Sequence, residues 1–475
     1  MHSTPRQGDK DMAIDIKNIT EKIKKTSDDI VEIVKNKLQK KNNGHYLSGK
    51  EVRAIAKSNK KAMLALEKEK NRKKAEHEYL STMKDDNNIL EIDNLHTYFY
   101  TDQGIVKAVN GVSINIPKNS TVGIVGESGC GKSVTSMSVM RLLQGPTGQI
   151  ASGSIRFKSL DFKRDEEGKP IPIYVRTKSG KVIYKKKKDK RGHFVIDREG
   201  NPVLVPLQAV NESGVLSYEM EEKVFDIAKM PIQEVHKIRG RQIAMIFQEP
   251  MTSLNPVFTI GDQLDEVTFI HTPGATKEMA KAHSLEMLKL VGIDKSDRVY
   301  NSYPHELSGG MRQRVMIAMA LACDPRLIIA DEPTTALDVT IQAQILDLLR
   351  DLKTRMNGSI MLITHDLGII AEMADYVVVM YAGRVIEQGT VQEIFHDPKH
   401  PYTMGLQKSK PSMETKSDTL FNIPGNVPNP VNMPTHCYFK DRCDKCIGKC
   451  SGDYPCMKQV SPTHYVACHL YEEEK

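Results

Sequence analysis

The chain has 475 residues, of which 39% are apolar, and a formal net charge of +7. This length allows two or three domains, and the positive charge suits a bound polyanion or an anionic surface. No apolar run approaches the roughly 20 residues that cross a bilayer, and the polar segment Met1 to Asp11 lacks the apolar core of a secretory signal. We therefore expect a cytoplasmic protein with no membrane-spanning segment of its own.

Residues 1–88 are predicted to be a charged helical extension. Apolar residues recur at helical spacing in its first half, up to a break at 42–44. Ser48 and Glu51 then have the spacing of a capping box, which predicts a second helix through Tyr79. We interpret the segment as an accessory docking or solubilising extension, since it is nearly free of the aromatic residues that a nucleic-acid-binding arm uses.

Strand-like segments follow at 90–92, 95–100 and 105–116, and they predict an antiparallel sheet. Three consecutive aromatic residues at 98–100 lie shortly before the phosphate-binding motif described next. One of them could stack on a nucleotide base, and alternation and position favour Phe99. Packing in the core is the alternative for each of the three.

The segment GESGCGKS matches the phosphate-binding loop pattern G-x-x-x-x-G-K-[ST]. A β-branched apolar run at 121–125 precedes it, and a helix is predicted at 134–143. Glycines let backbone N–H groups converge on phosphates at the start of a helix. Lys132 would reach the β- and γ-phosphates, and the Ser133 hydroxyl would bind Mg²⁺. The residues expected to contact nucleotide here are Gly126, Glu127, Ser128, Gly129, Cys130, Gly131, Lys132 and Ser133.

Residues 159–232 are predicted to be an insertion with two β-hairpins, whose tips lie at 178–181 and 199–201. The basic run 185–188 is interpreted as a solvated surface. The insertion lacks heptads, which argues against the long coiled coil that splits some chromosome-maintenance ATPases. Its composition indicates no particular function.

Four polar residues each lie at the end of a predicted strand. Gln248 could bind Mg²⁺ or an attacking water. Asp331 suits Mg²⁺, as carboxylates at this place do in phosphate-loop enzymes, and the adjacent Glu332 is the candidate general base for water. His365 follows another buried strand, where it could sense a γ-phosphate.

The segment LSGGMRQ places Ser308, Gly309 and Gly310 ahead of a helix predicted at 311–322, which makes a second anion-binding helix terminus. One nucleotide does not need two such sites in one chain. Two chains arranged head to tail would each offer this loop to the γ-phosphate held by the other. Asp338 lies beyond and could pass contacts between the subunits.

Six of the eight cysteines lie within 437–468, after a proline-rich linker at 398–434. In a cytosolic protein such clustering favours a metal over disulfides. Thiolates suit either an iron–sulfur cluster or zinc, and the Cys443-x2-Cys446 pair keeps zinc open.

Taken in order, these motifs resemble the nucleotide-binding subunit of an ABC transporter, over about 90–395 and interrupted by the insertion. The stretches VGESGCGKSVTSMSVMRLL, IFQEPMTSLNPVFTIGDQ and LSGGMRQRVMIAMAL are similar to the D-type subunit of oligopeptide and dipeptide permeases. The segments HPYT and IPG, from 400 and 423, are similar to the C-terminal extension of that family.

The resemblance implies an α/β fold, the P-loop NTPase cassette, with a mixed sheet core, an antiparallel β subdomain and a helical signature subdomain. We expect the charged helical extension at 1–88, the cassette with its insertion at 89–397, and a cysteine-rich C-terminal extension at 398–475. The last would carry a [4Fe–4S] cluster, with zinc or reduced structural thiols as the alternatives. Its implied ligands are Cys437, Cys443, Cys450 and Cys468.

The resemblance also implies site roles, with ATP and Mg²⁺ as cofactors. Gln248 and Asp331 would complete the metal and water shell around Ser133, Glu332 would polarise the water, and His365 would orient it. The loop at 308–310 would act on the ATP of the partner. Every consensus position is intact, so we expect a competent ATPase that works by positioning and electrostatics.

The implied partners are a second cassette, either an F-type homologue or another copy, two transmembrane permease subunits and an external peptide-binding protein. The chain would lie on the cytoplasmic face of the membrane and energise peptide uptake. An importer of nickel or another small solute is an alternative. A soluble ABC ATPase acting on ribosomes or DNA is another, but those usually carry two cassettes or a long coiled coil, so we expect no nucleic-acid partner.

Overall fold

The structure is a computed structural model, and it describes residues 48–472 with several gaps. The residues left undescribed are 1–47, 168, 178, 180, 189–194, 197–201, 210–217, 273, 336, 410–420, 432 and 473–475. The chain divides into one unit of residues 1–57 and another of residues 58–475. The first predicted helix of the N-terminal extension therefore lies outside the described residues.

The second predicted helix is α2, which spans Gly49–Lys70. Its capping box is confirmed, because the Glu51 carboxylate accepts from the Ser48 N–H at 2.9 Å and the Glu51 N–H donates to the Ser48 hydroxyl at 3.3 Å. The prediction that the helix runs through Tyr79 is wrong. The chain turns instead to join a sheet, where the Tyr79 carbonyl accepts from the Asp226 N–H at 2.8 Å.

Two sheets form the larger unit. One is antiparallel with strand order β1-β8-β5-β2-β3, and the other is mixed with order β14-β15-β13-β12-β4-β11-β10-β9. Strands β12, β4, β11, β10 and β9 are parallel, which confirms the predicted mixed sheet beside an antiparallel one. The strands are β1 Leu80–Ser81, β2 Asn88–Thr101, β3 Gly104–Pro117, β4 Thr121–Val125, β5 Gly148–Phe162, β8 Met220–Asp226, β9 Ile243–Ile246, β10 Leu327–Asp331, β11 Ser359–Thr364, β12 Tyr376–Tyr381, β13 Arg384–Thr390, β14 Lys458–Gln459 and β15 Tyr465–Val466.

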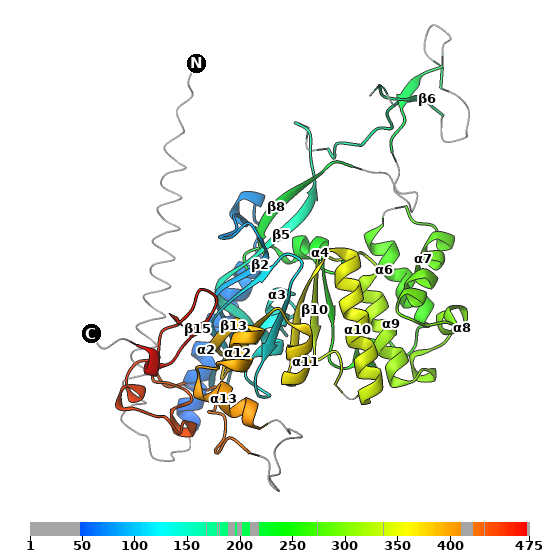
Figure 1. The fold of residues 1–475 in the computed structure, drawn as a ribbon. Helices are drawn as coiled ribbons and strands as arrows, with labels where there is room; N and C mark the ends of the chain where they lie inside the picture. Colours follow the sequence, from blue (N-terminus) through cyan, green and yellow to red (C-terminus); the bar gives the residue numbers. More distant parts are fainter. Residues whose placement is uncertain are drawn as a thin grey trace, which may run out of the picture. The chain divides into compact units, whose positions relative to one another are not determined.

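Helices pack against the mixed sheet, and α6, α7, α8 and α9 gather into a separate helical group (Figure 1). This group contains the predicted signature helix, so the helical subdomain is confirmed. The helices are α3 Lys132–Val139, α4 Ile232–Ile238, α5 Pro250–Ser253, α6 Ile260–His271, α7 Lys277–Leu290, α8 Ser296–Tyr300, α9 Gly309–Leu321, α10 Val339–Met356, α11 Leu367–Met373, α12 Val391–His396 and α13 Pro401–Lys408.

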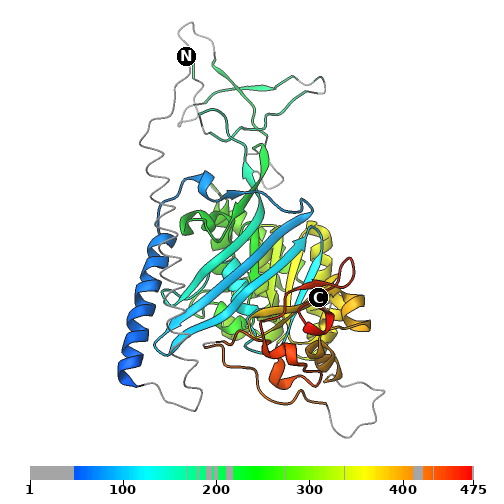
Figure 2. The same ribbon diagram turned by 90° about the vertical axis from the view of Figure 1, so that its left-hand side faces the viewer.

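The parallel strands are buried on both faces, which explains their continuous apolar sequences. In β10, Ile328 and Ala330 point into a core shared with the helices, whereas Leu327 and Ile329 point into a core shared with the antiparallel sheet. Figure 2 shows the long antiparallel strands lying across the front of the mixed sheet. The polar ends of the parallel strands are thereby held at one edge of a rigid, two-sided core.

The insertion differs from its prediction in extent and pairing. Strands β5 and β8 pair as far as Phe162 and Met220, so both ends of the predicted insertion belong to the antiparallel sheet. Beyond them, the arms of both predicted hairpins do contact each other, because the Ile183 N–H donates to the Val175 carbonyl and the Val203 N–H to the Val195 carbonyl, both at 2.9 Å. In addition, β6 (Tyr184–Lys186) pairs with β7 (Leu204–Pro206), which was not predicted. Arg176 and Val182 still form the bridge expected beside the first tip.

The insertion contains a repeat that sequence reasoning missed. At three places along the insertion, three residues from separate backbone segments come together. At each place, which we call a level, the N–H of each residue donates to the carbonyl of another, and the three hydrogen bonds of 2.8–2.9 Å close a ring. Successive levels lie 12 residues apart along the outgoing chain, from 163 to 175 to 187. The rings are formed by Lys163, Ile171 and Glu219, by Val175, Ile183 and Leu207, and by Lys187, Val195 and Val203.

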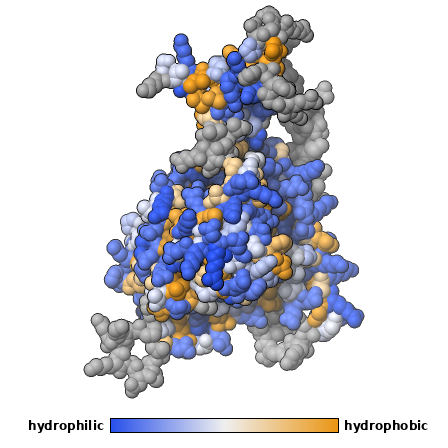
Figure 3. Space-filling view, turned by 90° about the vertical axis from the view of Figure 1, so that its right-hand side faces the viewer, coloured by the Kyte–Doolittle hydropathy of each residue, from blue (hydrophilic) through white to orange (hydrophobic). Residues whose placement is uncertain are grey.

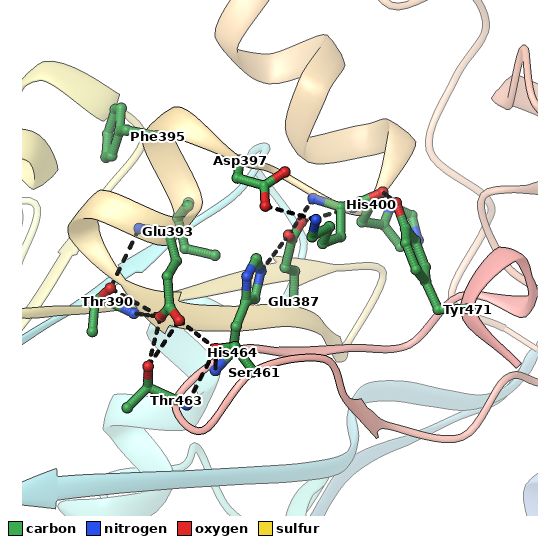
Figure 4. A network of polar contacts seen from close by, with 12 residues as sticks. Glu387, Thr390, Glu393, Phe395, Asp397, His400, Ser461, Thr463, His464 and Tyr471 are labelled. Atoms are coloured by element: carbon green, nitrogen blue, oxygen red, sulfur yellow. Dashed lines mark hydrogen bonds and ion pairs between the residues drawn. The ribbon is translucent and has the colours of Figure 1, made fainter.

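A polar network attaches the end of the chain to the cassette (Figure 4). The buried Glu387 carboxylate accepts from the Lys399 and His400 backbone N–H groups at 2.6 and 2.9 Å and contacts His464 Nε2 at 2.8 Å. Burial lowers the pKa of His400 to about 4, so its neutral Nδ1 can accept from the Tyr402 N–H at 3.0 Å. The C-terminal extension is thus built onto β13 and the start of α13.

No helix in the described part of the chain is long and apolar enough to cross a membrane. The face that includes the helical group is mostly hydrophilic, with apolar side chains in small separate groups (Figure 3).

Candidate active site

The phosphate-binding loop connects β4 to α3, as predicted. Gly131 caps the helix in a left-handed conformation with φ of 100°. A Cβ atom there would lie 2.3 Å from the Ala108 carbonyl oxygen, and one on Gly126 would lie 2.2 Å from that of Met380. Both glycines are therefore required by the close approach of the loop to neighbouring backbone. The helix ends before the predicted residue 143, because Arg141 adopts φ of 52°.

The Lys132 ammonium lies inside this loop. The residue is only 5% exposed, and its Nζ donates to the Gly126 carbonyl at 2.8 Å and to the Glu127 carbonyl at 3.1 Å. Phosphate oxygens would offer the same ammonium stronger, charge-assisted acceptors. The arrangement suits an anion held between the backbone N–H groups of the loop and this side chain.

Ser133 and Asp331 meet below the loop, although they are far apart in the sequence. The Ser133 hydroxyl donates to Asp331 Oδ1 at 3.0 Å, and the Ser136 hydroxyl lies 3.4 Å from Oδ2. Burial raises the pKa of Asp331. A bound cation would act in the opposite direction and favour the charged carboxylate. A hydroxyl and a carboxylate are hard oxygen ligands, and this donor set fits Mg²⁺.

Glu332 is the centre of a second polar cluster. Gln248 Nε2 donates to its Oε2 at 3.0 Å, the Thr335 hydroxyl donates to the same atom at 2.9 Å, and His365 Nδ1 lies 3.3 Å from Oε1. Glu332 adopts φ of 48°, a left-handed conformation that a non-glycine residue rarely adopts and that is common at functional sites. Strands β9, β10 and β11 thus bring the three predicted residues Gln248, Glu332 and His365 together.

The aromatic residues of β2 point to opposite faces of the sheet. Thr97 faces α3, where its hydroxyl lies 2.8 Å from that of Ser138. The register with β5 is regular from 97 to 99, so Phe99 shares that face. Tyr98 faces the other way, and its hydroxyl donates to Asn110 at 3.0 Å. Of these two, Phe99 therefore lies on the face of the strand that carries Thr97 and contacts α3.

The signature residues lie at the start of α9. The Ser308 hydroxyl accepts from the Met311 N–H at 3.3 Å, and Ser308 and Gly309 are exposed. The helix begins at Gly309, two residues before the predicted start. Asp338 caps α10 in the same way, accepting from the Ile341 N–H at 3.0 Å.

The predicted metal ligands of the extension lie near one another. Burial raises the pKa of Cys437 and Cys443 to about 11, and the neighbouring Cys450 and Cys468 thiols add to the shift. Within the described residues, however, no group of three or more His, Cys, Asp or Glu side chains is arranged to hold a metal ion. The geometry therefore does not support the predicted iron–sulfur cluster or zinc site.

Sequence reasoning missed the contacts that the C-terminal extension makes with the loop. The Glu127 N–H donates to the Tyr402 hydroxyl at 2.9 Å, and the Glu127 carboxylate pairs with Arg442. The partners are 275 and 315 residues away in the sequence. In the sequence near Arg442, its charge next to Cys443 was the sole indication that this residue could make such a contact.

A phosphate-binding loop between a parallel strand and a helix, a Ser–Asp pair suited to Mg²⁺, and a glutamate held by Gln248 and His365 define an ATP-hydrolysing cassette. In agreement, the family model described as "ABC transporter" matches residues 109–195 and 208–335. The model described as "Oligopeptide/dipeptide transporter, C-terminal region" matches residues 386–450.

Individual relatives show which group of ABC transporter proteins this chain is similar to. The oligopeptide transport ATP-binding protein AppD of Bacillus subtilis is 42% identical over 386 residues, which are 81% of this chain and 98% of AppD. OppD of the same organism is 42% identical over 80% of this chain and 88% of its own length. The dipeptide transport ATP-binding protein DppD is 40% identical over 81% and 95%. The chain belongs to this family of ABC transporter ATP-binding subunits, and its cassette is an ATPase.

Proposed function

We propose that this chain is the ATP-hydrolysing subunit of an importer of oligopeptides or dipeptides, working on the cytoplasmic face of the cell membrane. The observation that carries the catalytic part is the cluster of Gln248, Glu332 and His365 at one edge of the sheet, next to the Ser133–Asp331 pair. The names of the 40–42% identical relatives, and the matching C-terminal region, support peptides as the solute.

Each side chain of the site has its own role in ATP binding or hydrolysis. Lys132 and the loop N–H groups bind the β- and γ-phosphates, and Phe99 stacks on the base. Ser133, Asp331 and Gln248 would hold Mg²⁺, which would supply positive charge to the phosphates when bound. Glu332 accepts a proton from the attacking water, with its carboxylate already oriented by three neighbours, and His365 orients that water.

The signature loop acts on a second cassette. Ser308 and Gly309 are exposed at the start of the 13-residue helix α9, so the loop is accessible to another chain. Residues 308–310 would complete the γ-phosphate site of a partner, and Asp338 would lie at the same interface. The partner is an F-type homologue or a second copy of this chain.

Exposed apolar side chains near Gln248 support docking to membrane subunits. Met251, Val257 and Phe258 are 58%, 72% and 52% exposed. Exposed large apolar side chains that lie close together in one short segment, here 251–258, favour a protein–protein contact. A contact at this place would link movement of the Gln248 loop to two permease subunits, to which an external binding protein delivers the peptide.

Isolation of the tagged chain from membranes, together with uptake assays, tests this function. We expect two hydrophobic permease subunits to co-purify, and a deletion strain to lose uptake of labelled oligopeptides. A plasmid copy should restore uptake. Co-purification with ribosomes, or loss of nickel uptake with peptide uptake intact, would contradict the proposal.

The iron–sulfur cluster stays a proposal, on Cys437, Cys443, Cys450 and Cys468. Its only support is the soft donor chemistry of these four thiols, with zinc as the alternative. Anaerobically purified protein should then contain iron and absorb broadly in the visible range. Metal-free protein without that absorption would remove both options.

A further inference from the structure

The C-terminal extension reaches the phosphate-binding loop through one ion pair. Arg442 Nη1 lies 2.8 Å from Glu127 Oε2, and Nη2 lies 3.0 Å from Oε1. This is the bidentate geometry in which arginine binds carboxylates most strongly. The two side chains are 6% and 26% exposed, so the pair is largely shielded from water.

The arginine is held in place by its own surroundings. Its Nε donates to the Pro424 carbonyl at 3.0 Å and its Nη2 to the Ile423 carbonyl at 3.3 Å. The guanidinium also lies 5.8 and 5.9 Å from the ring centres of Tyr381 and Phe439. The bond to Glu127 raises the pKa of Arg442 further, so it is always charged. The guanidinium group of Arg442 is therefore held in place before any ligand binds.

Glu127 is the second residue of the loop and is fixed at three points. Its N–H donates to Tyr402, its carbonyl accepts from Lys132, and its carboxylate binds Arg442. The Tyr402 ring packs against Phe439 of the extension, with centres 5.5 Å apart. The extension and the loop therefore form one packed unit.

The charge of Glu127 presents a problem for ATP binding. A carboxylate in a phosphate-binding loop repels the polyphosphate, and this repulsion is strong where the pair is shielded from solvent. Arg442 reduces this repulsion, because it neutralises the Glu127 carboxylate and holds it against the extension. The loop N–H groups and Lys132 then determine the local potential.

We propose that Arg442 is a positioning residue of the nucleotide site, which neutralises Glu127 and fixes the loop for phosphate binding. The C-terminal extension is then part of the ATP site as well as an appendage of the cassette. This inference rests on the ATP-binding function of the cassette and is independent of the transported solute.

Titration of the purified full-length chain with a fluorescent ATP analogue tests the proposal. Arg442→Gln should raise the Kd for ATP about tenfold and raise KM more than it lowers kcat, because the uncompensated carboxylate repels the phosphates. Glu127→Gln should instead lower the Kd about threefold, because Arg442 keeps its charge near the loop. The double variant should recover most of the affinity that Arg442→Gln loses.

The rescue separates electrostatic positioning from a structural role. If the pair only joined the extension to the cassette, both single variants would weaken binding and the double variant would not recover. That result, or wild-type affinity in Arg442→Gln, would overturn the proposal. Arg442→Lys, which keeps the charge but not the fork, should be intermediate, and melting curves check folding.

Lys449→Gln is the matched control, because it removes an exposed cation from the same extension. Its Kd should equal that of the wild type, and a tenfold loss there would contradict a specific role for Arg442. If the wild-type chain itself failed to bind ATP, the assigned function would be wrong, which is a different outcome from failure of Arg442→Gln to weaken binding.

Discussion

Replacement of Glu332 by glutamine is expected to lower ATP turnover by at least about a hundredfold while ATP binding is retained. The amide keeps the size of the side chain but cannot accept the proton of the attacking water, and general base catalysis contributes about 10²–10⁴-fold. Gln248, Thr335 and His365 would still hold a side chain in this place. Steady-state phosphate release measures the loss, and size-exclusion chromatography with ATP should show an accumulating closed dimer.

Glu372→Gln serves as the control for that substitution. Glu372 is an exposed carboxylate that pairs with Arg350, away from the strand ends that form the site. Its removal should leave turnover unchanged. Undiminished turnover in Glu332→Gln would reject the assignment of Glu332 as the general base.

Lys132→Ala should weaken ATP binding by about 100-fold. The ammonium is 5% exposed and lies between two loop carbonyls, so phosphate would gain a charge-assisted hydrogen bond worth about 1.5–3 kcal/mol. Truncation removes this bond and the only charge of the motif that attracts phosphate. The same fluorescent titration measures the Kd.

Lys118→Ala removes an equal charge from an exposed position at the end of β3, where the ammonium lies 3.8 Å from Glu222. ATP affinity should not change in this variant. An unaltered Kd in Lys132→Ala would mean that the loop does not bind phosphate as assigned.

Much of the site could be predicted because it depends on local patterns. The loop from Gly126 to Ser133 is read from one strand, one turn and one helix. Asp331 and His365 each follow a run of buried residues, and parallel strands bring their ends to the same edge. The order of motifs therefore indicated which residues would meet, without giving their distances.

Other features could not be read, because they depend on contacts between distant segments. Arg442 lies beside Glu127 because the extension, through Tyr402 and Phe439, packs on Tyr381 of the cassette. The helix predicted through Tyr79 stops early, since pairing with β8 outweighs local helix propensity. In the insertion, turn residues indicated hairpins, but the three-segment rings also need Val203, Leu207 and Glu219 on the returning chain to close them.

Two cassettes are expected to close over ATP, each placing its signature loop against the ATP that the other binds. Ser128 in the phosphate-binding loop and Ser308 in the signature loop are both exposed and well suited to cross-linking. Isotope-labelled Ser128→Cys chains would be mixed with unlabelled Ser308→Cys chains, both carrying Glu332→Gln, and oxidised with ATP. Mass spectrometry of the peptides shows which chain supplied each cysteine.

We expect an ATP-dependent disulfide that joins a labelled peptide containing residue 128 to an unlabelled peptide containing residue 308. A link between these two positions that forms only when both cysteines are placed in one polypeptide, and never between two, would contradict it.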